Sequence, residues 1–570
     1  MMSVWQNRVV AYSIPFLLFA AAALLAQAWL SSPYEGMWLM DGSLRRPADG
    51  LDAWRAYGQP ALVLSLTALG VLGLVWHRSK VGEKGTSPSA SRTPWLLVAA
   101  VMAVSAGVRL PLLNAELHRD EQDNLANHIL GKWRILDQAK QGTPRRPSAA
   151  ALNENFIPPV AAQWAVLDLV SQPKRAKWAP VRWTETLIGN RRGNNPPLNS
   201  ALARLTNRAW QLLADVDSRR FNLMALRFPS FLAMTLATGG LFLLGLQWFK
   251  KLSLAYLVAL LFLLHPLVIR YGTLCRGYSF LMLFIVFAWL AWDHALRRPE
   301  RWTLWFYGSL SNCLAVLAFP GYALPGLLTQ AVPALLLFLK SRRQQDHPWP
   351  TFICGTLSAA CLCLPLLATT WIQSAFATNY DYPYFRDSLA WMPRFLGGGL
   401  CGLIVPSREL LPGSHGFTPP DLWSQVWSTM PYAVVVLVLV SSWTLMVTLR
   451  ALQRVNTLAS LLLAALILGA VVTGLAAWFC RGNELLYWYA MYLAFVLPVC
   501  LAAGSDSPVR FVKIGSFAAI FVFVLGTFPF GLPGQLALYP VKRFEILCSR
   551  LKQIYLVSDN EGRTVEIRVR

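Results

Sequence analysis

The chain has 570 residues, of which 55% are hydrophobic and only 14% are charged, and its formal net charge is +23 at pH 7. So apolar a composition excludes an ordinary water-soluble protein of this length. There is no Walker A segment, no glycine-rich dinucleotide motif and no Cys or His spacing typical of zinc, so nucleotide hydrolysis and redox chemistry have no support. The basic charge suits anionic membrane lipid or a polyanionic substrate, and we expect no nucleic-acid partner.

Apolar segments long enough to cross a membrane recur along the whole chain. A helix rises about 1.5 Å per residue and the hydrocarbon core is roughly 30 Å thick, so each span needs about 20 largely apolar residues. We predict an all-α polytopic membrane protein with about 13 transmembrane helices. The predicted spans are residues 9–30, 60–76, 94–113, 228–248, 252–270, 276–296, 302–319, 321–340, 350–370, 431–449, 456–478, 485–503 and 510–530.

Lys and Arg gather in the short loops on one side of these spans. Such loops stay on the cytoplasmic side of a membrane. The sequence therefore predicts a multi-pass protein of the cell inner membrane with a cytoplasmic N-terminus and a periplasmic C-terminus. The basic loops are residues 78–92, 250–251, 297–301, 340–343, 450–454 and 510–513. The long outward segments are residues 31–59, 114–227, 371–430 and the tail from 531.

The first large outward loop begins with two adjacent carboxylates, Asp120 and Glu121. Apolar residues follow them at helical spacing, which predicts an amphipathic helix lying on the membrane surface. Those residues are Leu125, Ile129 and Trp133. Acidic residues at a helix start also cap it and complement its dipole, so a purely structural role for the pair stays open.

Three further outward segments carry polar or proline-rich motifs. Pro196-Pro197-Leu198 precedes an amphipathic run over residues 200–213, and Arg227-Phe228-Pro229-Ser230 begins the fourth predicted span. We expect two surface helices here to flank a membrane-bounded cavity. A later turn holds Arg270, Arg276 and Tyr278. Arginine at membrane depth usually faces a cavity or an anion, which predicts a phosphate site, although snorkelling to the interface would explain the same residues.

The remaining outward segments are aromatic or strand-like. Residues 371–430 include Tyr380 and Tyr382, whose rings suit contact with a sugar or acceptor, or equally an interfacial aromatic belt. The tail alternates apolar and polar residues around Asp559-Asn560-Glu561-Gly562, which predicts a small β-hairpin.

In their order, these motifs resemble the GT-C glycosyltransferases that use polyprenyl-phosphate sugars, particularly the protein O-mannosyltransferase and lipid A aminoarabinose transferase branch, glycosyltransferase family 39-like. The resemblance covers about residues 95–340. It implies a GT-C-like bundle and a sugar transferred, with inversion, from a polyprenyl-phosphate donor at the periplasmic face. The implied regions are an N-terminal two-helix extension with a linker (1–93), a catalytic transmembrane region (94–370), an outward loop (371–430), C-terminal helices (431–530) and an outward tail (531–570).

Sugar transfer from a polyprenyl phosphate needs a base for the acceptor and positive charge for the departing phosphate. We assign the base to Asp120, with Glu121 either orienting it or holding a divalent cation such as Mg²⁺ or Mn²⁺. Arg270, Arg276 and Tyr278 are the predicted phosphate-binding residues. Two positions depart from the family pattern, where His usually precedes the Pro-Pro pair and Asn precedes the later Pro. They are Asn195 and His265, which we predict to bind substrate together with Tyr380 and Tyr382.

Two other functions remain compatible with the sequence. A transporter or flippase of lipid-linked glycans would also carry many spans, basic cavity residues and an acidic pair, but the sequence shows no inverted repeat. An O-antigen ligase or polymerase also works outside the membrane on lipid-linked sugar. Which sugar moves, and whether the acceptor is a lipid, a protein or a polysaccharide, the sequence leaves open.

Overall fold

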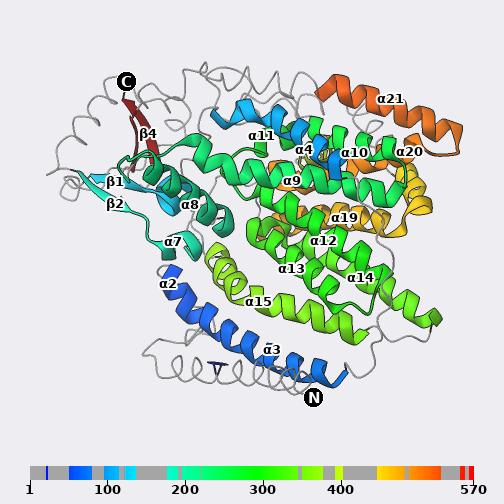
Figure 1. The fold of residues 1–570 in the computed structure, drawn as a ribbon, viewed down its shortest axis with the longest axis horizontal. Coiled ribbons are helices and arrows are strands. Elements are labelled where there is room, and N and C mark those ends of the chain that lie inside the picture. Colours follow the sequence, from blue (N-terminus) through cyan, green and yellow to red (C-terminus); the bar gives the residue numbers. More distant parts are fainter. Residues whose placement is uncertain are drawn as a thin grey trace.

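Figure 1 shows the computed structural model of the chain. The described residues are 21–22, 50–79, 95–114, 121, 124–135, 176–189, 196–218, 220–344, 349–375, 392–401, 446–481, 487–527, 553–558 and 564–569.

Helices make up most of the described structure. Their bounds are α2 Gly50–Ala53, η1 Trp54–Gly58, α3 Gln59–Ser79, α4 Trp95–Arg109, η2 Leu110–Asn114, η3 Leu125–Ile129, α7 Trp183–Leu187, α8 Pro197–Leu213, α9 Leu223–Phe249, α10 Leu252–Leu264, α11 Pro266–Tyr271, α12 Tyr278–Arg297, α13 Trp302–Ala318, η5 Pro320–Tyr322, α14 Ala323–Gln344, α15 Trp349–Ala375, α16 Met392–Cys401, α19 Thr457–Arg481, η9 Tyr487–Phe495, α20 Val496–Ser505 and α21 Arg510–Thr527.

Within the described residues, six helices are long and apolar enough to cross a membrane, judged by length and composition. Two shorter apolar helices accompany them, Leu252–Leu264 and Tyr489–Ser505. The predicted helical membrane fold is therefore confirmed. The six helices run over Trp95–Leu113, Leu223–Phe249, Tyr278–Arg297, Pro320–Ser341, Trp349–Thr370 and Thr457–Ala477.

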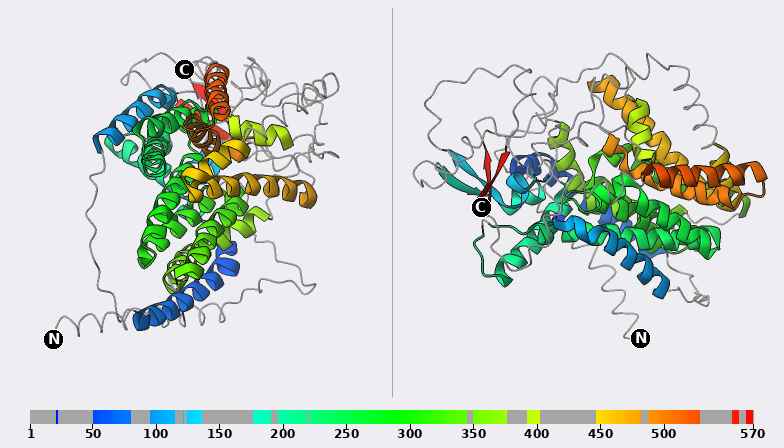
Figure 2. Two further views of the ribbon diagram at one scale, coloured as in Figure 1. Left: turned by 90° about the vertical axis from the view of Figure 1, so that its right-hand side faces the viewer. Right: turned by 90° about the horizontal axis from the view of Figure 1, so that it is seen from above.

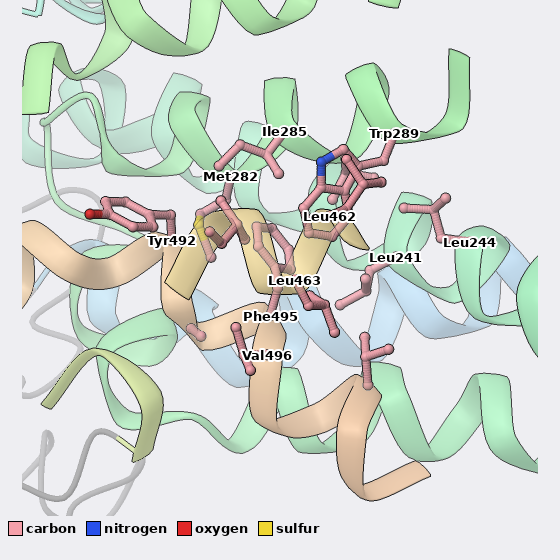
Figure 3. Packing of buried hydrophobic residues seen from close by; sticks show 14 of the residues in the cluster. Leu241, Leu244, Met282, Ile285, Trp289, Leu462, Leu463, Tyr492, Phe495 and Val496 are labelled. Atoms are coloured by element: carbon pink, nitrogen blue, oxygen red, sulfur yellow. The ribbon is translucent and has the colours of Figure 1, made fainter. Parts of the chain in front are cut away.

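Side chains from helices far apart in the sequence fill the centre of the bundle (Figure 3). Phe495 of η9 stacks on Phe262 of α10, with ring centroids 5.1 Å apart. The ring of Trp289 in α12 lies 5.4 Å from Phe495 on another side. Lipid tails are as apolar as these side chains, so close packing rather than escape from water holds such helices together.

The turn that joins α9 to α10 lies at one end of the bundle. Lys251 in this turn places its Nζ 2.7 Å from a carboxylate oxygen of Asp506, which follows α20. The pair is solvent-exposed, so it contributes about 0–1 kcal/mol. The start of α9 lies at the opposite end, beside α7 and α8 (Figure 1). The bundle thus separates these predicted cytoplasmic turns from the first outward loop.

A small sheet of four strands joins the first outward loop to the C-terminal tail. The strands are β1 Gly131–Ile135, β2 Ala176–Pro180, β3 Gln553–Ser558 and β4 Thr564–Val569, in the order β2-β1-β3-β4. β1 pairs antiparallel with β2 and parallel with β3, and β3 pairs antiparallel with β4. The tail strands lie beside the loop strands in the right-hand view of Figure 2. The predicted tail hairpin is confirmed.

The helix predicted through Trp133 is wrong in its second half. The helical segment η3 covers only Leu125–Ile129, and Trp133 lies in β1 opposite Trp178. Gly131 adopts φ 134°, a backbone conformation that disfavours residues with a Cβ and turns the chain out of the helix. The pairing partners of β1 come from distant segments, so local spacing could not reveal the strand.

The helix α3, which precedes residue 95 in the sequence, packs on the outside of the bundle. α3 runs along α15 in Figures 1 and 2. Gly58, just before α3, lies so close to Thr369 of α15 that a side chain at this position would collide with the threonine hydroxyl. The missing Cβ therefore permits the close approach of the two segments.

Candidate functional site

The turn between α11 and α12, residues 272–277, is where the four sequence motifs meet. All six residues of the turn are buried. Three segments that carry these motifs contact this turn: the segment with Glu121, the segment with Pro196, and the start of α9, which carries Arg227 and Ser230. The sequence motifs, which are spread over more than 150 positions, thus form one cluster, which we call the turn cluster.

A buried ion pair links the first outward loop to α9. Arg227 donates through Nε to Oε1 of Glu121 at 2.9 Å and through Nη2 to Oε2 at 2.6 Å. The two side chains are 1% and 0% exposed. Nη1 of Arg227 also donates to the carbonyl oxygens of Leu112 and Leu113, each at 3.1 Å. This bidentate, charge-assisted pair of hydrogen bonds holds the Glu121 carboxylate in one orientation.

Glu121 also binds the turn itself. The backbone N–H of Cys275 donates to Oε1 of Glu121 at 2.6 Å. Both carboxylate oxygens therefore accept hydrogen bonds, and Glu121 is poorly suited to hold a divalent cation. Among the described residues, no group of three or more His, Cys, Asp or Glu side chains could hold a metal ion. Of the two roles foreseen for Glu121, this geometry suits the orienting one.

The N-terminal end of α8 holds the turn through small polar side chains. Ser230 donates to Oδ1 of Asn199 at 2.8 Å, and Nδ2 of Asn199 lies 3.6 Å from the Cys275 sulfur. Ser200 donates to Oδ1 of Asn124 at 3.1 Å, while Nδ2 of Asn124 donates to the Cys275 carbonyl at 3.3 Å. Buried polar groups that satisfy one another specify a single arrangement. Of these residues, only Ser230 belongs to a motif identified from the sequence.

Burial alters the chemistry of the thiol at the centre of this network. Burial, reinforced by the nearby negative charge of Glu121, raises the pKa of Cys275 to about 12. The thiol therefore favours its protonated form at physiological pH, which disfavours a role as a nucleophile. Its part in the turn cluster is structural.

Gly277 allows the turn to pack tightly under the loop. A Cβ added here would lie 2.8 Å from Cβ of Pro196 and closer still to the carbonyl oxygen of Ala318. Any side chain would push the Pro-Pro segment or α13 away. A glycine is thus required between Arg276 and Tyr278, because the turn, the Pro-Pro segment and α13 approach one another closely here.

The predicted phosphate-binding residues lie within this turn and on either side of it. Arg276 is buried and Arg270 is half-buried, with its guanidinium 5.4 Å from the ring centroid of Tyr271. Tyr278 contacts both Tyr271, at 5.2 Å, and Phe319, at 5.4 Å between ring centroids. The structure therefore brings Arg270, Arg276 and Tyr278 to the same turn as Glu121.

The other predicted site residues divide into two groups. His265 is buried at the break between α10 and α11, where its Nε2 lies 3.2 Å from the carbonyl oxygen of Leu400 and its ring 6.1 Å from that of Phe523. These contacts connect it to α16 and α21. Outside the described residues lie Asp120, Asn195, Tyr380 and Tyr382.

The amphipathic run predicted over residues 200–213 is a helix, α8, and its polar side faces the protein. Its buried residues include Asn207 and Gln211, whose amides bond the backbone of the segment leading to α9. Leu212 and Leu213 are exposed. Leu198 and Leu202 of the same helix pack against the bundle core, so α8 presents both polar and apolar side chains to the protein.

We compared the chain with known families, curated proteins and solved structures. No family model and no curated protein matches it. The cryo-EM structure of arabinosyltransferase EmbB from Mycobacterium smegmatis is similar, with 12% sequence identity and a TM-score of 0.35. The similarity covers 84% of this chain and 46% of EmbB, so the chain spans about half of that protein's length. A TM-score this low carries no argument about activity.

Proposed function

We propose that the chain is a membrane glycosyltransferase of the GT-C type that moves a sugar from a polyprenyl-phosphate donor to an acceptor at the outward face of the inner membrane. The observation that supports it best is the turn cluster. There, motifs far apart in sequence place Glu121 and two arginines around one buried turn. A base must be positioned for proton transfer and a departing phosphate needs positive charge beside it, and Arg270 and Arg276 lie at this turn next to the held carboxylate of Glu121.

In the proposed reaction, the acceptor hydroxyl loses its proton to the carboxylate of Asp120. The acceptor oxygen then bonds to the anomeric carbon of the sugar as the bond from that carbon to the phosphate oxygen breaks. The phosphate leaves with the electron pair, and Arg276 and Arg270, with Tyr278, stabilise its negative charge. Attack opposite the leaving group inverts the anomeric carbon.

Glu121 would act as a positioning residue in this scheme. It directly follows Asp120 and is held by Arg227 and by the Cys275 N–H. In this proposal, holding Glu121 would limit how far the adjacent base can move. Catalytic groups lose much of their effect when displaced by about 1 Å, so such restriction matters.

Replacing Asp120 by Asn tests the proposal because Asn caps a helix about as well as Asp but cannot accept the proton. We expect transfer in the purified protein to fall by about 10²- to 10⁴-fold, with protein level and donor binding preserved. Mass spectrometry of envelope glycans and polyprenyl-phosphate sugars, with and without the protein, would identify the donor as an accumulating lipid-linked monosaccharide. Normal transfer by both Asp120→Asn and Glu121→Gln would contradict the mechanism and favour a transporter.

A further inference from the structure

A fully buried arginine lies next to the turn cluster, at the last turn of α4. Arg109 is 0% exposed. Its Nη1 donates to the carbonyl oxygen of Ser105 at 3.1 Å and also contacts the Ser105 hydroxyl. Its Nε and Nη2 have no hydrogen-bond partner among the described residues. The guanidinium thus keeps a positive charge that no described carboxylate neutralises.

Stability does not explain an arginine at this position. A buried guanidinium with unused donors is costly, and an apolar side chain of similar size often serves stability as well or better. The carboxylate of Glu121 is already held by Arg227 and the Cys275 N–H. Departures from ordinary packing rules are expected where a side chain has a functional task.

Arg109 lies directly against the backbone of the turn. A Cβ added to Gly272 would be 3.0 Å from Nε of Arg109 and 3.0 Å from Cγ of Met234. Gly272 lies between Arg270 and Arg276 in the sequence. The charge of Arg109 is therefore adjacent to the segment that carries the predicted phosphate-binding residues.

We propose that Arg109 is a positioning residue that supplies a fixed positive field to a phosphate group bound at this turn; this inference rests on the proposed function. Because Arg109 is fully buried, it acts through the turn and through its charge rather than by direct contact. In an interior of low dielectric, such a charge acts over longer distances than in water and is weakly screened by salt. The recognised group is the phosphate of a lipid-linked monophosphate.

The test compares Arg109→Met and Arg109→Lys with the wild type, using the full chain in detergent. The ligands are a polyprenyl monophosphate and the matching uncharged polyprenol, and thermal unfolding is followed in parallel. We expect Arg109→Met to bind the phosphate about tenfold or more weakly, to bind the polyprenol unchanged and to unfold at no lower temperature. Arg109→Lys should recover most of the phosphate affinity, since it keeps the charge.

Lys251→Met is the matched control, because it removes one positive charge at the other end of the bundle and should leave both affinities unchanged. Equal phosphate affinity in Arg109→Met and wild type would overturn the inference, as would equal loss of both ligands or failure of Lys to rescue. If Arg109→Met does not fold, Arg109→Gln replaces it under the same criteria. A wild type that does not prefer the phosphate over the polyprenol would refute the proposed function itself.

Discussion

The ion pair between Glu121 and Arg227 shows how one buried contact can fix a site. Its partners are 106 positions apart, and the sequence offers no local pattern that pairs them. The sequence places each residue in a motif, Glu121 beside Asp120 in an acidic pair and Arg227 in Arg227-Phe228-Pro229-Ser230. It could not predict that Glu121 faces Arg227 and the turn at Cys275, since that depends on how α9 and α12 pack.

Removing one partner of this pair should destabilise the protein. Glu121→Gln leaves the guanidinium of Arg227 buried without its counter-charge, which typically costs about 3–5 kcal/mol. We expect a lower unfolding temperature in detergent. The double variant Glu121→Gln with Arg227→Met should recover part of the loss, because it buries no charge. If the two single effects simply add, the two residues do not act as a pair.

Arg276 allows a test of the phosphate site that is separate from stability. Arg276→Ala should weaken binding of the polyprenyl-phosphate donor, and Arg276→Lys should restore only part of the affinity because Lys lacks the planar fork. Donor affinity is the measurement, with the uncharged polyprenol as control. Unchanged affinity in both variants would exclude Arg276 from the phosphate site and leave it a part of the buried turn.

At the scale of elements, six of the predicted spans are confirmed among the described residues, and the sheet was only partly predictable. A span is set by a physical length, so apolar runs identify α9, α12 and α15 with little ambiguity. The β3 and β4 hairpin is a local pattern with its own turn residues, and it was predicted. β1 was not, because the spacing of Leu125, Ile129 and Trp133 fits a helix, and the strands that pair with β1 come from elsewhere in the chain.

The parallel pairing of β1 with β3 predicts that the C-terminal tail stabilises the first outward loop. Val557 lies opposite Trp133 in that pairing. Val557→Pro removes a backbone N–H and fits poorly in an inner strand, whereas Val557→Ala keeps the backbone intact. Limited proteolysis should therefore cut the loop faster in the proline variant than in the alanine variant. Equal cleavage rates would show that the tail does not support the loop.

At the scale of the whole molecule, the loop and the tail must lie on one side of the membrane, because β1 and β3 share a sheet. The turn between α9 and α10, whose Lys251 pairs with Asp506 after α20, lies at the opposite end of the bundle from the start of α9 (Figure 1). Basic short loops usually stay in the cytoplasm, so we predict that the turn cluster lies at the outward end.

Cysteine labelling tests this orientation in a variant from which the nine native cysteines have been removed. A cysteine at Ser148, in the first outward loop, should react with a membrane-impermeant thiol reagent added to intact cells, and so should one at Arg570. A cysteine at Ser89, in the predicted cytoplasmic linker, should react only after the membrane is permeabilised. Reversed labelling would move the turn cluster to the cytoplasmic face, where a donor flipped to the outside could not reach it. Labelling of Ser148 without Arg570 would instead contradict the pairing of β1 with β3.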